Sequence, residues 1–156
     1  MNRIANGRKK KAVFIIKTDN KPSALDKYLQ DTANFRGNMD LYANSMEVLL
    51  DDILRKIGTK PPKMFGEKID RLRKNKRKWS RYTAKPDELL KKLTSFNADW
   101  IISKHGTSLA EPNITNITLV KDDVYYVFDK KKIEDIKKEF TQIQHSLIEI
   151  QKKLGI

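Results

Sequence analysis

Residues 23–57 read SALDKYLQDTANFRGNMDLYANSMEVLLDDILRKI, and this stretch decides the fold. Side chains recur in it at steps of three and four, the spacing that places them on one face of a helix. All of them except Thr32 are apolar: Leu25, Tyr28, Thr32, Phe35, Met39, Tyr42, Met46, Leu49 and Ile53. Because the phase survives Gly37-Asn38, the pattern predicts one helix rather than two helices broken there.

The ends of this helix carry their own signals. Ser23 is the expected N-cap, while Gly58 and the following Pro61-Pro62 stop the helix. The second half adds apolar residues outside the stripe, and we expect it to be the more deeply buried half: Val48, Leu50 and Leu54.

The rest of the chain predicts a mainly α, antiparallel helical bundle with two long and two shorter helices. The second long helix should span about residues 130–154, capped by Asp129, and the shorter helices about 62–77 and 86–105. Residues 117–120 and 124–128 are typical of a β-hairpin, with 107–116 as a loop before it. A strand at 12–18 could join the hairpin.

Composition limits the class of protein. The chain has 156 residues, which suits a single domain (1–156) with a basic N-terminal arm at 1–11. It has no cysteine, so disulfides and thiol chemistry are excluded. No apolar run approaches membrane-spanning length, and we expect a cytoplasmic protein that does not enter a membrane. The net charge of +13 favours a polyanionic partner, nucleic acid first.

The segment 71–82 is the strongest nucleic-acid signal. Lysines and arginines follow one another with only Asp70 near them, and two aromatic residues lie among them. Cations neutralise phosphates, and aromatic rings can stack on unpaired bases. The predicted binding residues are Arg71, Arg73, Lys74, Lys76, Arg77, Lys78, Trp79, Arg81 and Tyr82. The structural alternative is a solvated helix end whose Trp79 packs on the core.

Residues 97–108, NADWIISKHGTS, carry the candidate chemistry. Asn97 and His105 stand two helical turns apart on one flank, roughly 12 Å along the axis, so they can face one cleft. His105 could act as a general acid or base, since imidazole titrates near neutral pH. The alternative is a histidine that caps the helix C-terminus. The other histidine, His145, should face solvent.

Metal and cofactor sites have little support. Asp129-Lys-Lys131 after a strand matches part of a common magnesium-nuclease pattern. The chain has no glycine-rich phosphate loop, and we expect neither a cofactor nor a metal site.

Three segments together resemble the HEPN superfamily, over about residues 42–154: LLDDILRKIG (49–58), MFGEKIDRLRK (64–74) and FNADWIISKHGTS (96–108). The resemblance implies a small helical domain of prokaryotic defence or toxin–antitoxin systems, a homodimer, and in many members metal-independent ribonuclease activity. The family signature is an arginine, four to six residues, then a histidine. His105 matches the histidine, whereas Ala98, Asp99 and Trp100 occupy the places for the arginine.

The resemblance also suggests roles for individual residues. Asn97 corresponds to a polar residue often found earlier on that helix, and Lys104, Arg81 or an arginine of a partner subunit could replace the missing charge. We therefore expect a HEPN-like RNA-binding protein, with divergent ribonuclease activity at His105 as one form of it. Two alternatives stay open: a non-catalytic dimerisation or adaptor domain that binds a protein partner, such as an antitoxin or defence-system component, and a DNA-binding or metal-dependent nuclease.

Overall fold

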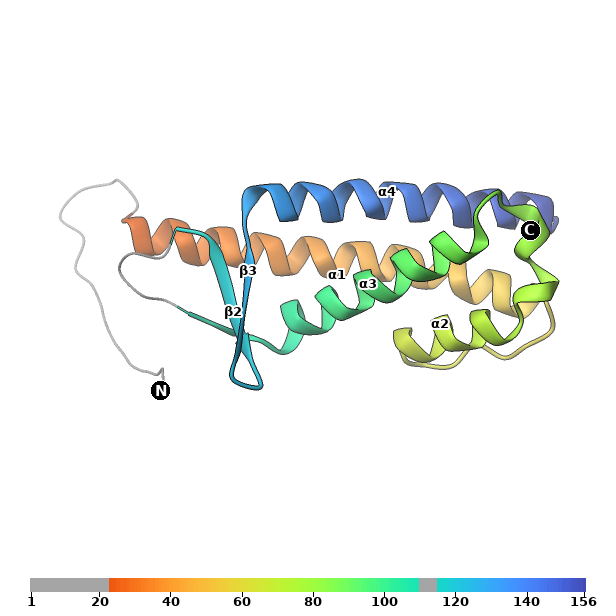
Figure 1. Cartoon of the computed structure of the whole chain (residues 1–156), viewed down its shortest axis with the longest axis horizontal. Coiled ribbons are helices and arrows are strands. Elements are labelled where there is room, and N and C mark those ends of the chain that lie inside the picture. Colours follow the sequence, from red (N-terminus) through yellow and green to blue (C-terminus); the bar gives the residue numbers. More distant parts are fainter. Residues whose placement is uncertain (1–22, 110–114) are drawn as a thin grey trace.

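The computed structural model describes residues 23–109 and 115–156. These residues form four α-helices and a small antiparallel sheet, which confirms the mainly α fold (Figure 1). The helices are α1 (Ala24–Lys56), α2 (Phe65–Lys74), α3 (Pro86–His105) and α4 (Lys130–Lys153). The predicted basic arm at 1–11 and the predicted strand at 12–18 lie outside the described residues.

Helix α1 is continuous over 33 residues, as its apolar phase predicts. Ser23 caps it: the Ser23 hydroxyl accepts from the Asp26 amide at 3.0 Å, and the Asp26 carboxylate accepts from the Ser23 amide at 3.4 Å. Thr32 is buried in the stripe because its hydroxyl donates to the Tyr28 carbonyl at 2.8 Å. The expectation for the second half is wrong at Val48, which is 62% exposed.

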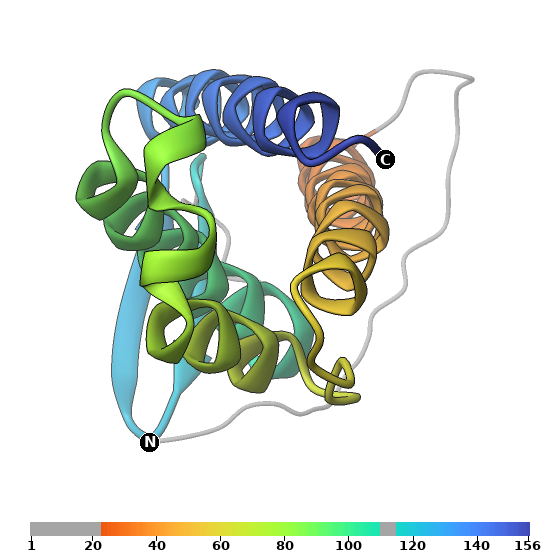
Figure 2. The ribbon, with the colours of Figure 1, turned by 90° about the vertical axis from the view of Figure 1, so that its right-hand side faces the viewer.

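Helix α3 runs antiparallel to α1 and α4, whereas the two long helices run in the same direction (Figure 1). Between the two long helices, the chain runs back along the bundle as α3 and then forms the sheet. Helix α4 can therefore start at the same end of the bundle as α1. Figure 2 shows the helices arranged around a shared interior. One core joins the four helices and the middle strand of the sheet through fully buried residues: Leu50, Leu72, Leu93, Leu119 and Ile143. No helix in the described ranges is long and apolar enough to cross a bilayer.

The sheet has the order β1-β2-β3, with β1 (Thr107–Ser108), β2 (Ile117–Lys121) and β3 (Val124–Phe128). The predicted hairpin is confirmed, and Asp122 and Asp123 turn it with φ values of 52° and 63°. The predicted loop at 107–116 was wrong at its start: Thr107 and Ser108 pair with Val120 and Leu119.

The second helix is shorter than the predicted 62–77. It ends at Lys74 because Asn75 caps it, its side-chain amide donating to the Arg71 carbonyl at 2.8 Å. The chain then continues as two 3-10 turns, η1 (Lys76–Lys78) and η2 (Ser80–Tyr82), which lead into α3. Figure 1 places these turns at the end of the bundle where α1, α2 and α4 finish.

Candidate functional site

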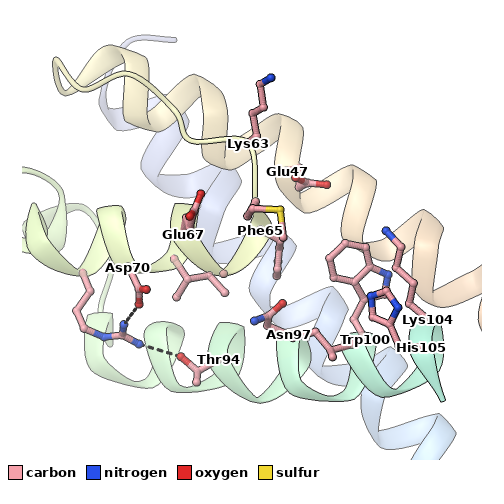
Figure 3. A pocket seen from close by; sticks show the side chains of 15 residues that line it. Glu47, Lys63, Phe65, Glu67, Asp70, Thr94, Asn97, Trp100, Lys104 and His105 are labelled. Atoms are coloured by element: carbon pink, nitrogen blue, oxygen red, sulfur yellow. Dashed lines mark hydrogen bonds and ion pairs between the residues drawn. The ribbon is translucent and has the colours of Figure 1, made fainter. Parts of the chain in front are cut away.

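A pocket of about 560 Å³ lies on the side of α3 that faces α2 and part of α1. Asn97, Lys104 and His105 all line it (Figure 3). The prediction that Asn97 and His105 face one cleft is therefore confirmed. Asn97 lies on the pocket floor, whereas Lys104 and His105 stand together at the C-terminal end of α3.

Aromatic side chains support the floor of this pocket. The rings of Phe65 and Trp100 meet edge to face, with centroids 5.6 Å apart. Asn97 lies directly against Gly66, where a Cβ would come within 3.1 Å of the Asn97 amide nitrogen. The absence of a side chain at residue 66 thus lets α2 approach the Asn97 side chain.

Trp100 is one of the three residues at the places for the arginine of the resemblance, and its contacts are structural. Its indole Nε1 donates to the Asp40 carboxylate on α1 at 2.9 Å. The Lys104 ammonium lies 4.9 Å from the centre of the Trp100 ring, a cation–π contact. Asp99, one residue earlier, pairs with Lys132 of α4 at 3.2 Å.

Arg36 of α1 holds the turn that follows His105, and the sequence patterns did not identify it. Its guanidinium donates to the carbonyl of Ser103, to the carbonyl of Gly106 at 2.8 Å and to the hydroxyl of Ser108 at 3.2 Å. Burial lowers the pKa of Arg36 from its ordinary value. Because its donors are used by these oxygens, Arg36 fixes the C-terminus of α3 and does not face the pocket as a catalytic cation.

A buried ion triad joins α1 and α2 beside the pocket, and one of its members, Glu47, also lines the pocket. The Lys68 ammonium contacts Glu47 at 3.0 Å and Asp51 at 2.8 Å, and the Lys68 side chain is 7% exposed. Burial by itself lowers the pKa of Lys68, but the hydrogen bonds and charges of Asp51 and Glu47 outweigh it and raise the pKa above its ordinary value. Lys68 lies on the apolar face of α2 beside Phe65, Ile69 and Leu72, a spacing that could have revealed it.

The predicted stacking role of Trp79 is wrong. Trp79 is fully buried, and its indole Nε1 donates to the Leu72 carbonyl at 2.8 Å. The alternative interpretation, packing on the core, describes its position. Tyr82 packs partly against the core, and Arg81 lies over its ring at 4.9 Å from the centre.

The basic residues around Trp79 fall into two groups. Several are held by their own chain: Arg71 donates to Thr59 and Lys60, Arg73 to Asp70 and Thr94, Lys76 to Asp87, and Lys78 to the Ile57 carbonyl. Lys74 and Arg77 are exposed and have no hydrogen-bond or ion-pair partner among the described residues. These two cations are the best placed to meet an external phosphate.

Arg81 cannot replace the missing arginine beside His105 within one chain. It precedes the N-terminus of α3, and His105 is the last residue of α3. At 1.5 Å per residue, a 20-residue helix separates them by roughly 30 Å. Lys104 is the cation that does lie beside His105 in the pocket.

The proposed magnesium pattern has a structural explanation. Asp129 caps α4 by accepting from the Lys132 amide at 2.7 Å, and Lys131 pairs with Asp135 at 2.9 Å. No cluster of three or more possible metal ligands occurs in the described part of the chain. His145 is exposed on α4, as predicted.

Comparisons with known proteins add no relative. No protein-family model, no curated protein and no solved structure matches this chain.

Proposed function

We propose that this chain is a HEPN-like RNA-binding domain that holds RNA phosphates at the end of the bundle formed by η1, η2 and the C-termini of α1, α2 and α4. The buried indole of Trp79 is the observation that carries the proposal. It anchors the turn to α2, so Lys74 and Arg77 project from an ordered backbone rather than from a loose helix end. Exposed, unpaired cations on a fixed frame suit phosphate contacts.

Neighbouring elements add charge to the same end. The last turns of α1 and α4 carry Arg55, Lys56, Lys152 and Lys153. Asp52, Asp87 and Glu149 pair there with Arg55, Lys76 and Lys153. Lys56 and Lys152, like Lys74 and Arg77, are exposed and have no ion-pair partner among the described residues. The surplus favours an extended polyanion over a single phosphate.

The test is a fluorescence-anisotropy titration of single-stranded RNA, duplex RNA and DNA over a series of salt concentrations. Lys74→Glu with Arg77→Glu should weaken RNA binding at least tenfold. It should also flatten the slope of log K against log salt by about 0.7 for each single-strand phosphate that is no longer neutralised. The matched control, Lys137→Glu with Lys138→Glu, removes the same charge from exposed positions on α4 and should bind normally. Equal weakening in both variants, or no RNA binding, would contradict the proposal.

A second candidate activity, metal-independent RNA cleavage, rests on the shared pocket of Asn97, Lys104 and His105. In it the His105 imidazole accepts the proton of a ribose 2′-hydroxyl, whose oxygen attacks the adjacent phosphorus. The 5′-oxygen of the next nucleotide leaves and takes a proton from water, and a 2′,3′-cyclic phosphate remains. The His105 imidazolium then gives its proton to the resulting hydroxide. Lys104 would offset the charge that develops on the phosphate.

The cleavage test is an RNA digest in EDTA. Cleavage by the wild-type chain that His105→Ala abolishes and His145→Ala preserves would support this activity. His145 is a suitable control because it is an exposed histidine on another helix. An intact substrate with the wild-type chain would contradict cleavage and leave RNA binding standing.

The resemblance also suggests the oligomeric state of the chain and the type of system in which it works. We infer a cytoplasmic homodimer in a defence or toxin–antitoxin type system, in which another component is a protein partner. Sedimentation of the pure chain over a range of concentrations tests the dimer. A monomer at all concentrations would contradict that part alone.

A further inference from the structure

Two apolar side chains that line the pocket are exposed to solvent. Met64 is 65% exposed and Ile101 is 38% exposed, and both line the pocket. They are next to Phe65 and Trp100 in the chain, and these two aromatic residues line the pocket as well. A flat apolar group placed there would remove this surface from water, and a volume of about 560 Å³ is within the range of small-molecule sites.

The polar group on the floor has no partner within the chain. Asn97 is half-buried, and no hydrogen bond of its side-chain amide is found among the described residues. Gly66 packs against one side of this amide, since the amide nitrogen lies 3.1 Å from where a Cβ of residue 66 would be. An amide both donates and accepts, so its free edge can pair with a ligand edge that does the same.

The charges of the pocket are divided between its two ends. Lys104 and His105 stand at the end of α3, and Lys63 lies at the rim on the other side of Phe65 (Figure 3). Of the three acidic residues in the lining, Glu47 pairs with Lys68 and Asp70 pairs with Arg73. Glu67, the remaining acid, lies on the other side of Phe65 from Lys104 and His105 (Figure 3), so an anion is better placed beside Lys104 and His105.

We propose that this pocket holds one unpaired nucleotide of RNA, with its base against Met64 and Ile101, the base edge on the Asn97 amide and a phosphate at Lys104. The inference rests on the proposed RNA binding and names the kind of RNA: a single strand or loop whose bases can turn outward. Trp100 is not the stacking surface, because Lys104 lies over its ring. The base edge that an asparagine amide characteristically holds with two hydrogen bonds is the N6 and N7 edge of adenine, so adenine is the expected base.

Anisotropy titrations of labelled oligo-A, oligo-C and oligo-U of about eight nucleotides test the pocket, a length within the usual single-strand site sizes. The wild-type chain should bind oligo-A best. Asn97→Leu should weaken oligo-A binding about tenfold and bring the three strands to similar affinity. Gly66→Ala should act in the same direction by displacing the Asn97 amide. Asn38→Leu, at an exposed asparagine of α1, should change neither affinity nor preference.

A second measurement needs no variant. In NMR spectra of the ¹⁵N-labelled wild-type chain, adding 5′-AMP should shift the Asn97 side-chain amide and the Trp100 indole signal. If neither signal moves, or if Asn97→Leu keeps the preference for oligo-A, the base pocket is wrong.

The two proposals fail differently. Absence of all RNA binding would overturn both. The pocket alone would be overturned by two results together. Lys74→Glu with Arg77→Glu would weaken RNA binding equally for all three strands, and the Asn97 side-chain amide signal would not shift when 5′-AMP is added.

Discussion

The indole Nε1 of Trp79 donates a hydrogen bond of 2.8 Å to the carbonyl oxygen of Leu72. This bond joins the 3-10 turns to the helix they follow, and both residues are fully buried. The most basic segment of the chain is therefore tied to the core by a residue whose type favours an external stacking role in the sequence.

Trp79→Phe should lower the free energy of unfolding by about 1–3 kcal/mol, because a smaller aromatic ring remains while the buried Leu72 carbonyl is left without its donor. Trp79→Ala should cost about 3–5 kcal/mol, since it also leaves a cavity. Urea denaturation measures both. Trp100→Phe is the matched control: it removes an exposed indole hydrogen bond to Asp40 and should cost less than Trp79→Phe. Equal costs for the two substitutions would show that burial of the bond has no consequence.

Lys68→Met should destabilise the chain by about 3–5 kcal/mol, because it leaves Glu47 and Asp51 facing each other without their shared cation. Adding Glu47→Gln and Asp51→Asn to Lys68→Met should restore most of the stability, since the two side chains then carry no charge. Thermal denaturation near neutral pH compares the two variants. A triple variant no more stable than Lys68→Met would contradict this explanation.

The raised pKa of Lys68 sets an alkaline limit on stability. A group that binds its proton more tightly when folded contributes stability that is complete below its unfolded pKa, here 10.5. This contribution is lost as the pH rises through the higher folded pKa. The urea midpoint of the wild-type chain should therefore fall more steeply above pH 10.5 than that of the Lys68→Met, Glu47→Gln, Asp51→Asn variant. Parallel curves would contradict the assignment.

Two glycines should respond in opposite directions to alanine. Gly106→Ala places a Cβ 2.6 Å from the Ile102 carbonyl oxygen and 3.0 Å from the Leu119 Cβ. The backbone must then shift, and we expect a destabilisation of at least about 2 kcal/mol. Gly37→Ala, at an exposed position of α1, meets nothing within 4 Å and should stabilise by about 0.5–1 kcal/mol. Denaturation curves with the same sign for both would contradict the packing at Gly106.

The sequence predicted the helices because their signals are local. The stripe of α1, Pro86 at the start of α3 and Asp129 before α4 all act within a few residues of themselves. The hairpin was predicted because its signals are also local, whereas β1 has no local signal. Thr107 and Ser108 form a strand only because β2 comes beside them.

The candidate site could be predicted only in part for the same reason. Asn97 and His105 share a helix flank, so their common cleft followed from spacing. Arg36 acts on residues about 70 positions away, and no periodic pattern connects it with them. Trp79 suited two interpretations, and its burial depends on how α2 and the 3-10 turns pack together.

Three helices finish at the same end of the bundle, and the lysines and arginines there also offset the charge of the helix C-termini. Each helix presents a partial negative charge of about half an electron at its C-terminus. The last turns of α1, α2 and α4 carry Arg55 and Lys56, Arg73 and Lys74, and Lys152 and Lys153, which oppose these macrodipoles. Part of the positive potential is thus balanced internally, so a phosphate there would meet a weaker field than the count of cations suggests.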